Sequence, residues 1–129
     1  MSRPIWRLAI RGEFCAAHAL RHYQGKCERL HGHNYGVEVT VQGERLLPDT
    51  ELLLDFTDMK AMLKQALESL DHQFLNDVPP FNDINPSAEN LARYIWQRLA
   101  PLLPQAVQLH SVTVSEKDIQ SATYMELEE

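Results

Sequence analysis

Residues 27–41 read Cys-Glu-Arg-Leu-His-Gly-His-Asn-Tyr-Gly-Val-Glu-Val-Thr-Val, and this stretch combines a strand pattern with the spacing of metal ligands. Valines alternate with other residues in its second half, which is typical of a half-buried β-strand. Alternate residues of an extended chain point to the same side, so His31 and His33 can direct two ring nitrogens at one point. His18 lies a short distance upstream and can supply a third nitrogen.

Three imidazole ligands with an open fourth position are typical of a catalytic zinc site, because structural zinc sites usually close all four positions with protein ligands. We therefore predict that His18, His31 and His33 bind Zn²⁺. Cys27 is open to three interpretations at this point: a fourth ligand, a reactive group beside the metal, or a buried residue. Lys26 and Arg29 favour its thiolate form, which makes Cys27 a candidate general base or nucleophile.

Length and composition predict one domain spanning residues 1–129 and a cytoplasmic location. The chain is 44% hydrophobic, has two cysteines without a Cys-x-x-Cys pair, and contains no apolar run of about twenty residues. Its net charge of −6 is uneven: residues 1–45 hold seven Lys/Arg and four Asp/Glu, whereas the remainder holds five and fourteen. We expect an anionic small molecule near the histidines, and neither nucleic acid nor a membrane as a partner.

The expected elements follow the order strand, strand, helix, helix, strand, strand. Strands are predicted over residues 5–11, 35–41, 111–116 and 122–127. One helix is predicted to be capped by Thr57 and to continue to Leu70, and a second to begin near Ser87. This order predicts an α+β fold, with a four-stranded antiparallel sheet and two helices packed on one face.

Two further places carry polar residues with a possible chemical role. Asp71 can set the tautomer of His72 and raise its basicity, as in an acid/base pair, although a histidine near a helix C-terminus also has a structural explanation. Glu116 ends an alternating strand, where its carboxylate can accept two hydrogen bonds from an amidine-like edge of a heterocycle or simply be solvated.

Six short motifs, in this order, resemble those of the 6-pyruvoyltetrahydropterin synthase superfamily. The resemblance runs from residue 14 to Tyr124. The motifs are Phe14-Cys15-Ala16-Ala17-His18, Cys27-x-x-x-His31-Gly32-His33-Asn34-Tyr35, Asp55-Phe56, Leu70-Asp71-His72-x-x-Leu75-Asn76, Asn85-Pro86-Ser87-x-Glu89-Asn90 and Val112-x-Val114-x-Glu116. The resemblance implies the T-fold, whose subunits pair their sheets into a barrel, commonly as a homohexamer built from two trimers. Active sites then lie between subunits.

The resemblance also implies roles for single residues. His18, His31 and His33 match the zinc ligands, and Cys27 matches the general base. His72, oriented by Asp71, matches a second proton-transfer group. Glu116 matches the residue that anchors the pterin ring, and Ser87 lies where the family has a hydroxyl near that ring.

Within the superfamily, the three residues between Cys27 and His31 resemble the bacterial 6-carboxy-5,6,7,8-tetrahydropterin synthases of queuosine biosynthesis. The implied reaction converts 7,8-dihydroneopterin triphosphate to 6-carboxytetrahydropterin, acetaldehyde and triphosphate. Lys26, Arg29 and Arg21 are candidates for binding the triphosphate. The alternatives are a 6-pyruvoyl synthase, which eliminates triphosphate from the same substrate, and a non-catalytic oligomer that binds zinc or pterin.

Overall fold

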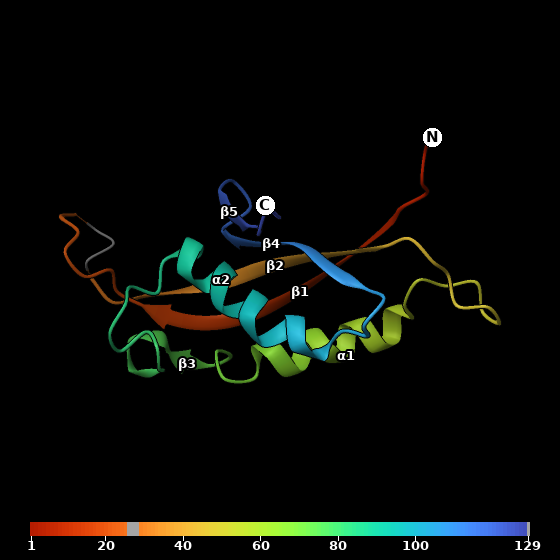
Figure 1. Cartoon of the computed structure of the whole chain (residues 1–129). Coiled ribbons are helices and arrows are strands. Elements are labelled where there is room, and N and C mark those ends of the chain that lie inside the picture. Colours follow the sequence, from red (N-terminus) through yellow and green to blue (C-terminus); the bar gives the residue numbers. More distant parts are fainter. Residues whose placement is uncertain (26–28, 129) are drawn as a thin grey trace.

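A computed structural model describes residues 1–25 and 29–128. Its sheet is dominated by two long antiparallel strands, β1 (Trp6–His18) and β2 (His31–Gly43), which pair without interruption from Trp6↔Gly43 to His18↔His31. β4 (Gln108–Glu116) pairs with β2, and β5 (Ser121–Tyr124) pairs with β4, both antiparallel. The four expected strands are therefore present, and β1 and β2 are longer than the alternating pattern alone predicts (Figure 1).

A fifth strand that the sequence did not predict lies at the β1 edge, giving the order β3-β1-β2-β4-β5. β3 (Gln73–Phe74) has only two residues and runs parallel to β1, pairing with Ala16 and Ala17. A two-residue strand leaves no periodic pattern in the sequence. It matters for the site because it fixes the segment that contains Asp71 and His72 against the end of β1.

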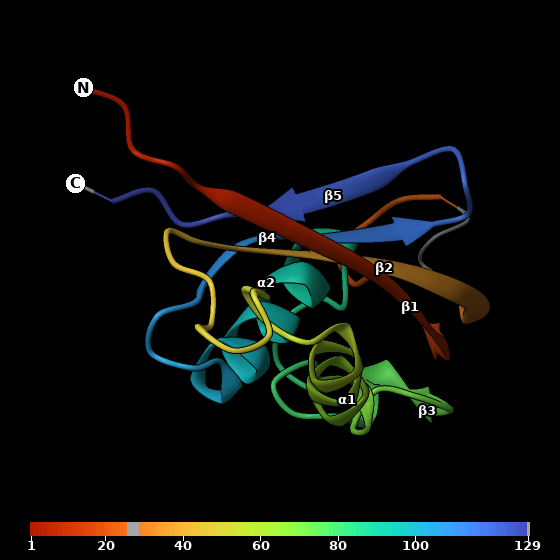
Figure 2. The same ribbon diagram turned by 90° about the vertical axis from the view of Figure 1, so that its right-hand side faces the viewer.

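The helices α1 (Phe56–Leu67) and α2 (Ala88–Leu99) cover the same face of the sheet (Figure 2). The core lies between these two layers, since the inward residues of the strands alternate with exposed ones and pack against the apolar stripes of both helices. Short 3-10 turns, η2 (Leu75–Asp77) and η3 (Ala100–Leu102), follow β3 and α2. None of the helices in the described part of the chain is long and apolar enough to cross a bilayer.

The helix ends differ in part from the sequence prediction. Ser87 caps α2 as expected, with its hydroxyl accepting a hydrogen bond from the Asn90 N–H at 3.2 Å. The cap of α1 is Asp55 and not Thr57, because the Asp55 carboxylate accepts the Thr57 N–H at 2.8 Å. α1 also ends at Leu67 and not Leu70, since the chain turns there and then enters the left-handed region at His72.

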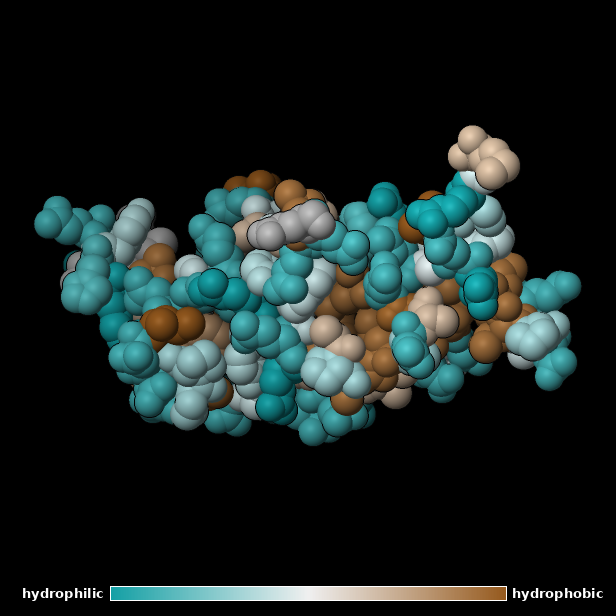
Figure 3. All heavy atoms as spheres, viewed as in Figure 1, coloured by the Kyte–Doolittle hydropathy of each residue, from teal (hydrophilic) through white to brown (hydrophobic). Residues whose placement is uncertain are grey.

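The surface in the view of Figure 3 is mostly hydrophilic, with hydrophobic side chains emerging mainly on the side of the N-terminal arm. A hollow of about 1100 Å³ lies between the N-terminal arm (residues 1–5), the end of β2 and the C-terminal segment (residues 125–128). Ile5, Trp96 and Met125 contribute apolar parts of its lining. It is at the opposite end of β1 and β2 from the histidines and contains none of the predicted site residues.

Candidate metal centre and active site

The three predicted zinc ligands come together at one end of the two long strands. His18 ends β1 and is the register partner of His31 at the start of β2, and His33 follows two positions later on the same face. One ring nitrogen from each of the three lies within 4.8 Å of the others. Ligand nitrogens at about 2.0–2.1 Å from a tetrahedral zinc ion are about 3.4 Å apart, so small ring movements would accommodate a metal ion.

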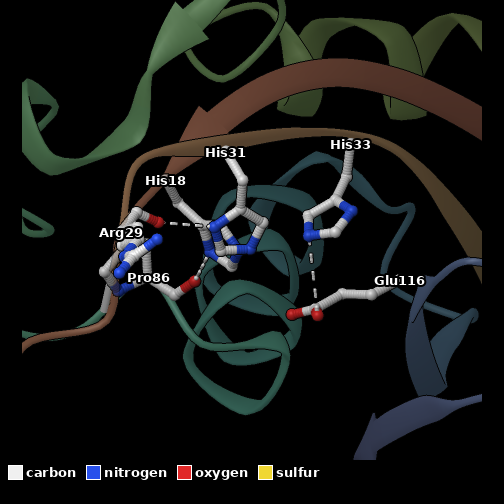
Figure 4. Close-up of polar contacts among 6 residues, drawn as sticks. All are labelled: His18, Arg29, His31, His33, Pro86 and Glu116. Carbon is white, nitrogen blue, oxygen red and sulfur yellow. Dashed lines mark hydrogen bonds and ion pairs between the residues drawn. The ribbon is translucent and has the colours of Figure 1, made fainter. Parts of the chain in front are cut away.

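Backbone carbonyls determine which ring nitrogens are available. His18 Nδ1 donates to the Pro86 carbonyl at 2.8 Å and His31 Nδ1 donates to the Arg29 carbonyl at 2.7 Å (Figure 4). A carbonyl can only accept, so in each neutral ring the proton is on Nδ1 and the Nε2 lone pair is free. The two Nε2 atoms are 2.9 Å apart, and two lone pairs at that distance require a proton or a cation between them.

Burial favours the neutral form of His18 and His33. His18 is 1% exposed, and burial lowers the pKa of both His18 and His33 below the ordinary value of 6.5, although the Glu116 carboxylate acts in the opposite direction. His33 Nε2 is buried without a hydrogen-bond partner among the described residues. Neutral imidazoles with uncommitted nitrogens are the form that binds a metal ion, so the donor set fits one.

Glu116 lies beside this cluster. Its carboxylate oxygen Oε2 is 3.9 Å from His33 Nε2, and both side chains are largely buried. Register explains the placement, because Glu116 is the direct partner of Tyr35 across β2 and β4 and shares the face of the core valines of β4. The carboxylate is therefore positioned to bind a group that enters next to the histidines (Figure 4).

Tyr35 is a buried residue that the sequence analysis did not single out. It is 0% exposed, its ring stacks on Phe14 at 4.7 Å, and it makes edge contacts with the rings of His18 and His33. Its hydroxyl has no hydrogen-bond partner among residues 1–25 and 29–128. Burial raises the pKa of Tyr35, with Glu116 adding to the effect, so the hydroxyl stays protonated.

The candidate triphosphate ligands have different environments. The Arg21 guanidinium donates to the carbonyls of Asn76, Phe81 and Ile84 at 3.3, 2.8 and 3.0 Å. These bonds tie Arg21 to a neighbouring loop, an arrangement that leaves no pattern in the sequence, and its role toward the triphosphate stays a prediction. The side chain of Arg29 is exposed and near His31, whereas Lys26 lies outside the described residues, as does Cys27.

Asp71 and His72 are held at the β1 edge by backbone contacts with Cys15. The Asp71 carboxylate accepts the Cys15 N–H at 3.0 Å, and the His72 N–H donates to the Cys15 carbonyl at 2.6 Å. The His72 side chain is 78% exposed, and its Nε2 is 3.6 Å from the nearer Asp71 oxygen, beyond hydrogen-bond distance. Within the described part of the chain, no hydrogen bond joins this pair to the histidine cluster.

A hollow of about 620 Å³ adjoins this pair, lined by Cys15, Asn34, His72, Phe74 and His33 among others. Cys15 is exposed there, and its thiol donates to the Asn34 side-chain oxygen at 2.8 Å. Free cysteines commonly behave as small buried hydrophobes, so the residue type alone predicts a buried, inert Cys15. That prediction is wrong, because Cys15 belongs to the outward-facing set of β1. One chain therefore has the histidines beside Glu116, and the exposed Asp71–His72 pair at a hollow that His33 also lines.

Comparison with known proteins identifies the family. The sequence profile described as 6-pyruvoyl tetrahydropterin synthase matches residues 7–127. The chain belongs to this family. It is 42% identical to the human 6-pyruvoyl tetrahydrobiopterin synthase over 104 residues, covering 78% of this chain and 70% of that one. It is 36% identical to the 6-carboxy-5,6,7,8-tetrahydropterin synthase of Synechocystis over 124 residues, covering 93% of both chains.

The fold agrees with this membership. The structure of the Caenorhabditis elegans 6-pyruvoyl tetrahydropterin synthase superposes with a TM-score of 0.83 at 27% identity, covering 98% of this chain and 99% of that one. The expectation of a T-fold with two helices on one face of a mainly antiparallel sheet is confirmed. The three histidines of this family member form a site that could hold a metal ion.

Proposed function

We propose that this chain is a zinc-dependent 6-carboxytetrahydropterin synthase of queuosine biosynthesis. The reaction converts 7,8-dihydroneopterin triphosphate, with uptake of water, to 6-carboxy-5,6,7,8-tetrahydropterin, acetaldehyde and triphosphate. Oxidation of the side chain balances reduction of the ring, so the reaction requires no redox cofactor. The observation that carries the proposal is the convergence of three histidine nitrogens beside the largely buried carboxylate of Glu116.

Each site residue has a part in this proposal. His18, His31 and His33 would hold Zn²⁺, which when bound would supply Lewis-acid chemistry at the substrate. Glu116 accepts two hydrogen bonds from the guanidine-like edge of the pterin, an interaction strengthened by its charge and two-point geometry. Cys27 removes a carbon-bound proton, and His72 transfers a second one. Ser87 places a hydroxyl near the ring, and Arg29 binds the triphosphate.

The choice between two products rests on coverage and spacing. The Synechocystis relative aligns over 93% of both chains, whereas the human one aligns over 70% of its own length. Three residues separate Cys27 from His31, the short gap of the carboxy branch. The higher identity to the human protein favours the second candidate, a 6-pyruvoyl synthase that eliminates triphosphate from the same substrate.

We also propose that the active site is completed by a second copy of the chain, within a homohexamer of two trimers. The 78% exposure of the His72 side chain, which makes no hydrogen bond to the histidine cluster among the described residues, supports this arrangement. Mixing two inactive variants tests it: His72→Ala and His33→Ala proteins, co-expressed, regain activity if one copy supplies the proton-transfer group and another the metal. If the mixed oligomer stays inactive while each variant assembles normally, the shared site is wrong.

The deciding experiment is incubation of the zinc-loaded protein with 7,8-dihydroneopterin triphosphate, followed by mass spectrometry of the products. Carboxytetrahydropterin with acetaldehyde supports the proposal, and pyruvoyltetrahydropterin as the main product supports the second candidate. If a metal-replete oligomer forms neither product, that result contradicts both candidates and favours a non-catalytic binding role.

Two variants test the assigned roles separately. We expect Cys27→Ala to abolish turnover while retaining bound zinc, and loss of zinc would instead make Cys27 a ligand. We expect Arg29→Ala to raise the Michaelis constant for the triphosphate substrate. An unchanged Michaelis constant would remove Arg29 from the binding site.

A further inference from the structure

Two asparagine side chains fasten the loop that follows His18. Asn85 accepts the Arg21 N–H at 2.8 Å and donates to the Arg21 carbonyl at 2.9 Å. Asn76 makes the same pair of bonds with Ala19, at 2.9 and 2.8 Å. Each side-chain amide therefore hydrogen-bonds to both the N–H and the carbonyl of a single residue, as the backbone of a neighbouring β-strand does.

Of the two asparagines, only Asn85 is next in the chain to the residue whose carbonyl accepts the His18 proton. The carbonyl that receives the His18 Nδ1 proton belongs to Pro86, the next residue after Asn85. The Asn85 carbonyl in turn accepts from the Asn90 side chain at 2.9 Å, and Ser87 caps the same helix. The Pro86 carbonyl is therefore held between the loop after β1 on one side and the first turn of α2 on the other.

We propose that Asn85 is a positioning residue for His18, acting through the Pro86 carbonyl. The contacts form a closed ring, from the His18 imidazole to Pro86, along the chain to Asn85, across to Arg21 and back along the backbone to His18. This ring holds the acceptor at hydrogen-bond distance from the imidazole and keeps the proton on Nδ1, so that Nε2 presents its lone pair.

The assignment rests on the proposed metal-binding function, and Asn76 provides a matched control. Asn85→Ala and Asn76→Ala each remove two side-chain bonds to the backbone of the same short loop, at Arg21 and Ala19. The two losses are alike in number and kind. Only Asn85→Ala also loosens the carbonyl that orients His18.

The test has two readouts on purified protein: zinc affinity by competition with a chromophoric chelator, and the His18 tautomer by nitrogen-detected NMR of the metal-free protein. We expect Asn85→Ala to weaken zinc binding about 10–100-fold, the range for loss of a ligand's hydrogen-bond partner, and to give His18 a mixture of tautomers. Asn76→Ala should weaken zinc binding less than about 10-fold and leave His18 protonated on Nδ1. Thermal unfolding in chelator shows whether the two variants lose similar stability.

Equal zinc affinities of the two variants, or an unchanged His18 tautomer in Asn85→Ala, would overturn the assignment. If Asn85→Ala does not fold, Asn90→Ala replaces it, because this change removes the bond to the Asn85 carbonyl while the backbone cap at Ser87 remains. A wild-type protein that binds no zinc contradicts the proposed function. The tautomer measurement then still decides the link between Asn85 and His18, since it uses metal-free protein.

Discussion

Replacing Tyr35 with phenylalanine should stabilise the metal-free protein, although it removes a polar group from the candidate site. The Tyr35 hydroxyl is fully buried and has no hydrogen-bond partner in the described part of the chain. A buried donor without a partner costs about 1–3 kcal/mol, and phenylalanine keeps the ring and its stacking on Phe14. Taking the lower end, we expect the free energy of unfolding to rise by about 1 kcal/mol, which is about 4 °C in melting temperature for a domain of this size.

Tyr94→Phe is the matched control, because it is the same chemical change at a hydroxyl that has a partner. The Tyr94 hydroxyl is 2.7 Å from the Ser69 hydroxyl in a partly buried position. Losing that bond should lower the free energy of unfolding by about 1 kcal/mol, so the two variants should differ by about 2 kcal/mol with opposite signs. Urea titrations in chelator, at one protein concentration, measure both. A Tyr35→Phe protein destabilised as much as Tyr94→Phe would refute the reasoning.

Three further outcomes follow from the site. The lowered pKa values of His18 and His33 mean that the unfolded chain takes up protons that the folded chain does not, so the metal-free protein should lose stability as the pH falls below about 6.5; equal stability in denaturant at pH 8 and about 5.5 would contradict this. Zinc at a free concentration about 100 times its dissociation constant should add about 2.7 kcal/mol, seen as a higher melting temperature, and His33→Ala should abolish the gain. Arg21→Gln should lower the free energy of unfolding in urea by about 2–3 kcal/mol and change the Michaelis constant less than Arg29→Ala does. Little loss of stability with a larger change in the Michaelis constant would instead place Arg21 in the substrate site.

Strand periodicity made much of this site predictable. The two-residue spacing of His31 and His33 predicts a shared face, and the alternation in 35–41 predicts that this face is the buried one. The structure confirms that both rings lie on the helix-covered side and that His18 joins them. The order of elements was enough to predict two helices on one face, since an α+β fold with an antiparallel sheet has its helices on one face or at one end of that sheet.

What could not be predicted depends on contacts between segments distant in the sequence. Arg21 was a candidate anion ligand because it clusters with Lys26 and Arg29 beside the metal motif, yet its guanidinium donates to three carbonyls of residues 76–84. The role of Pro86 as the acceptor for His18 could not be predicted either, because every residue type has a backbone carbonyl. Thr57 was a reasonable helix cap, but Asp55 has the stronger acceptor at the position where the chain enters the helix.

The pairings that build the sheet also fix the site. A slip of one residue between β1 and β2 would turn His18 or His31 to the outer face, because side chains alternate along a strand. Thirteen uninterrupted pairs resist such a slip, and the irregularity in the sheet lies between Thr40 and Val41, near the opposite end. Glu116 depends on the same register through its pairing with Tyr35. Among the described residues, Asp71 and His72 have no such fixation to the cluster: a two-residue strand, the contacts with Cys15 and the bond from the Asp71 N–H to the Leu67 carbonyl hold them. A second copy of the chain would therefore have to supply the contacts that hold Asp71 and His72 beside a histidine cluster.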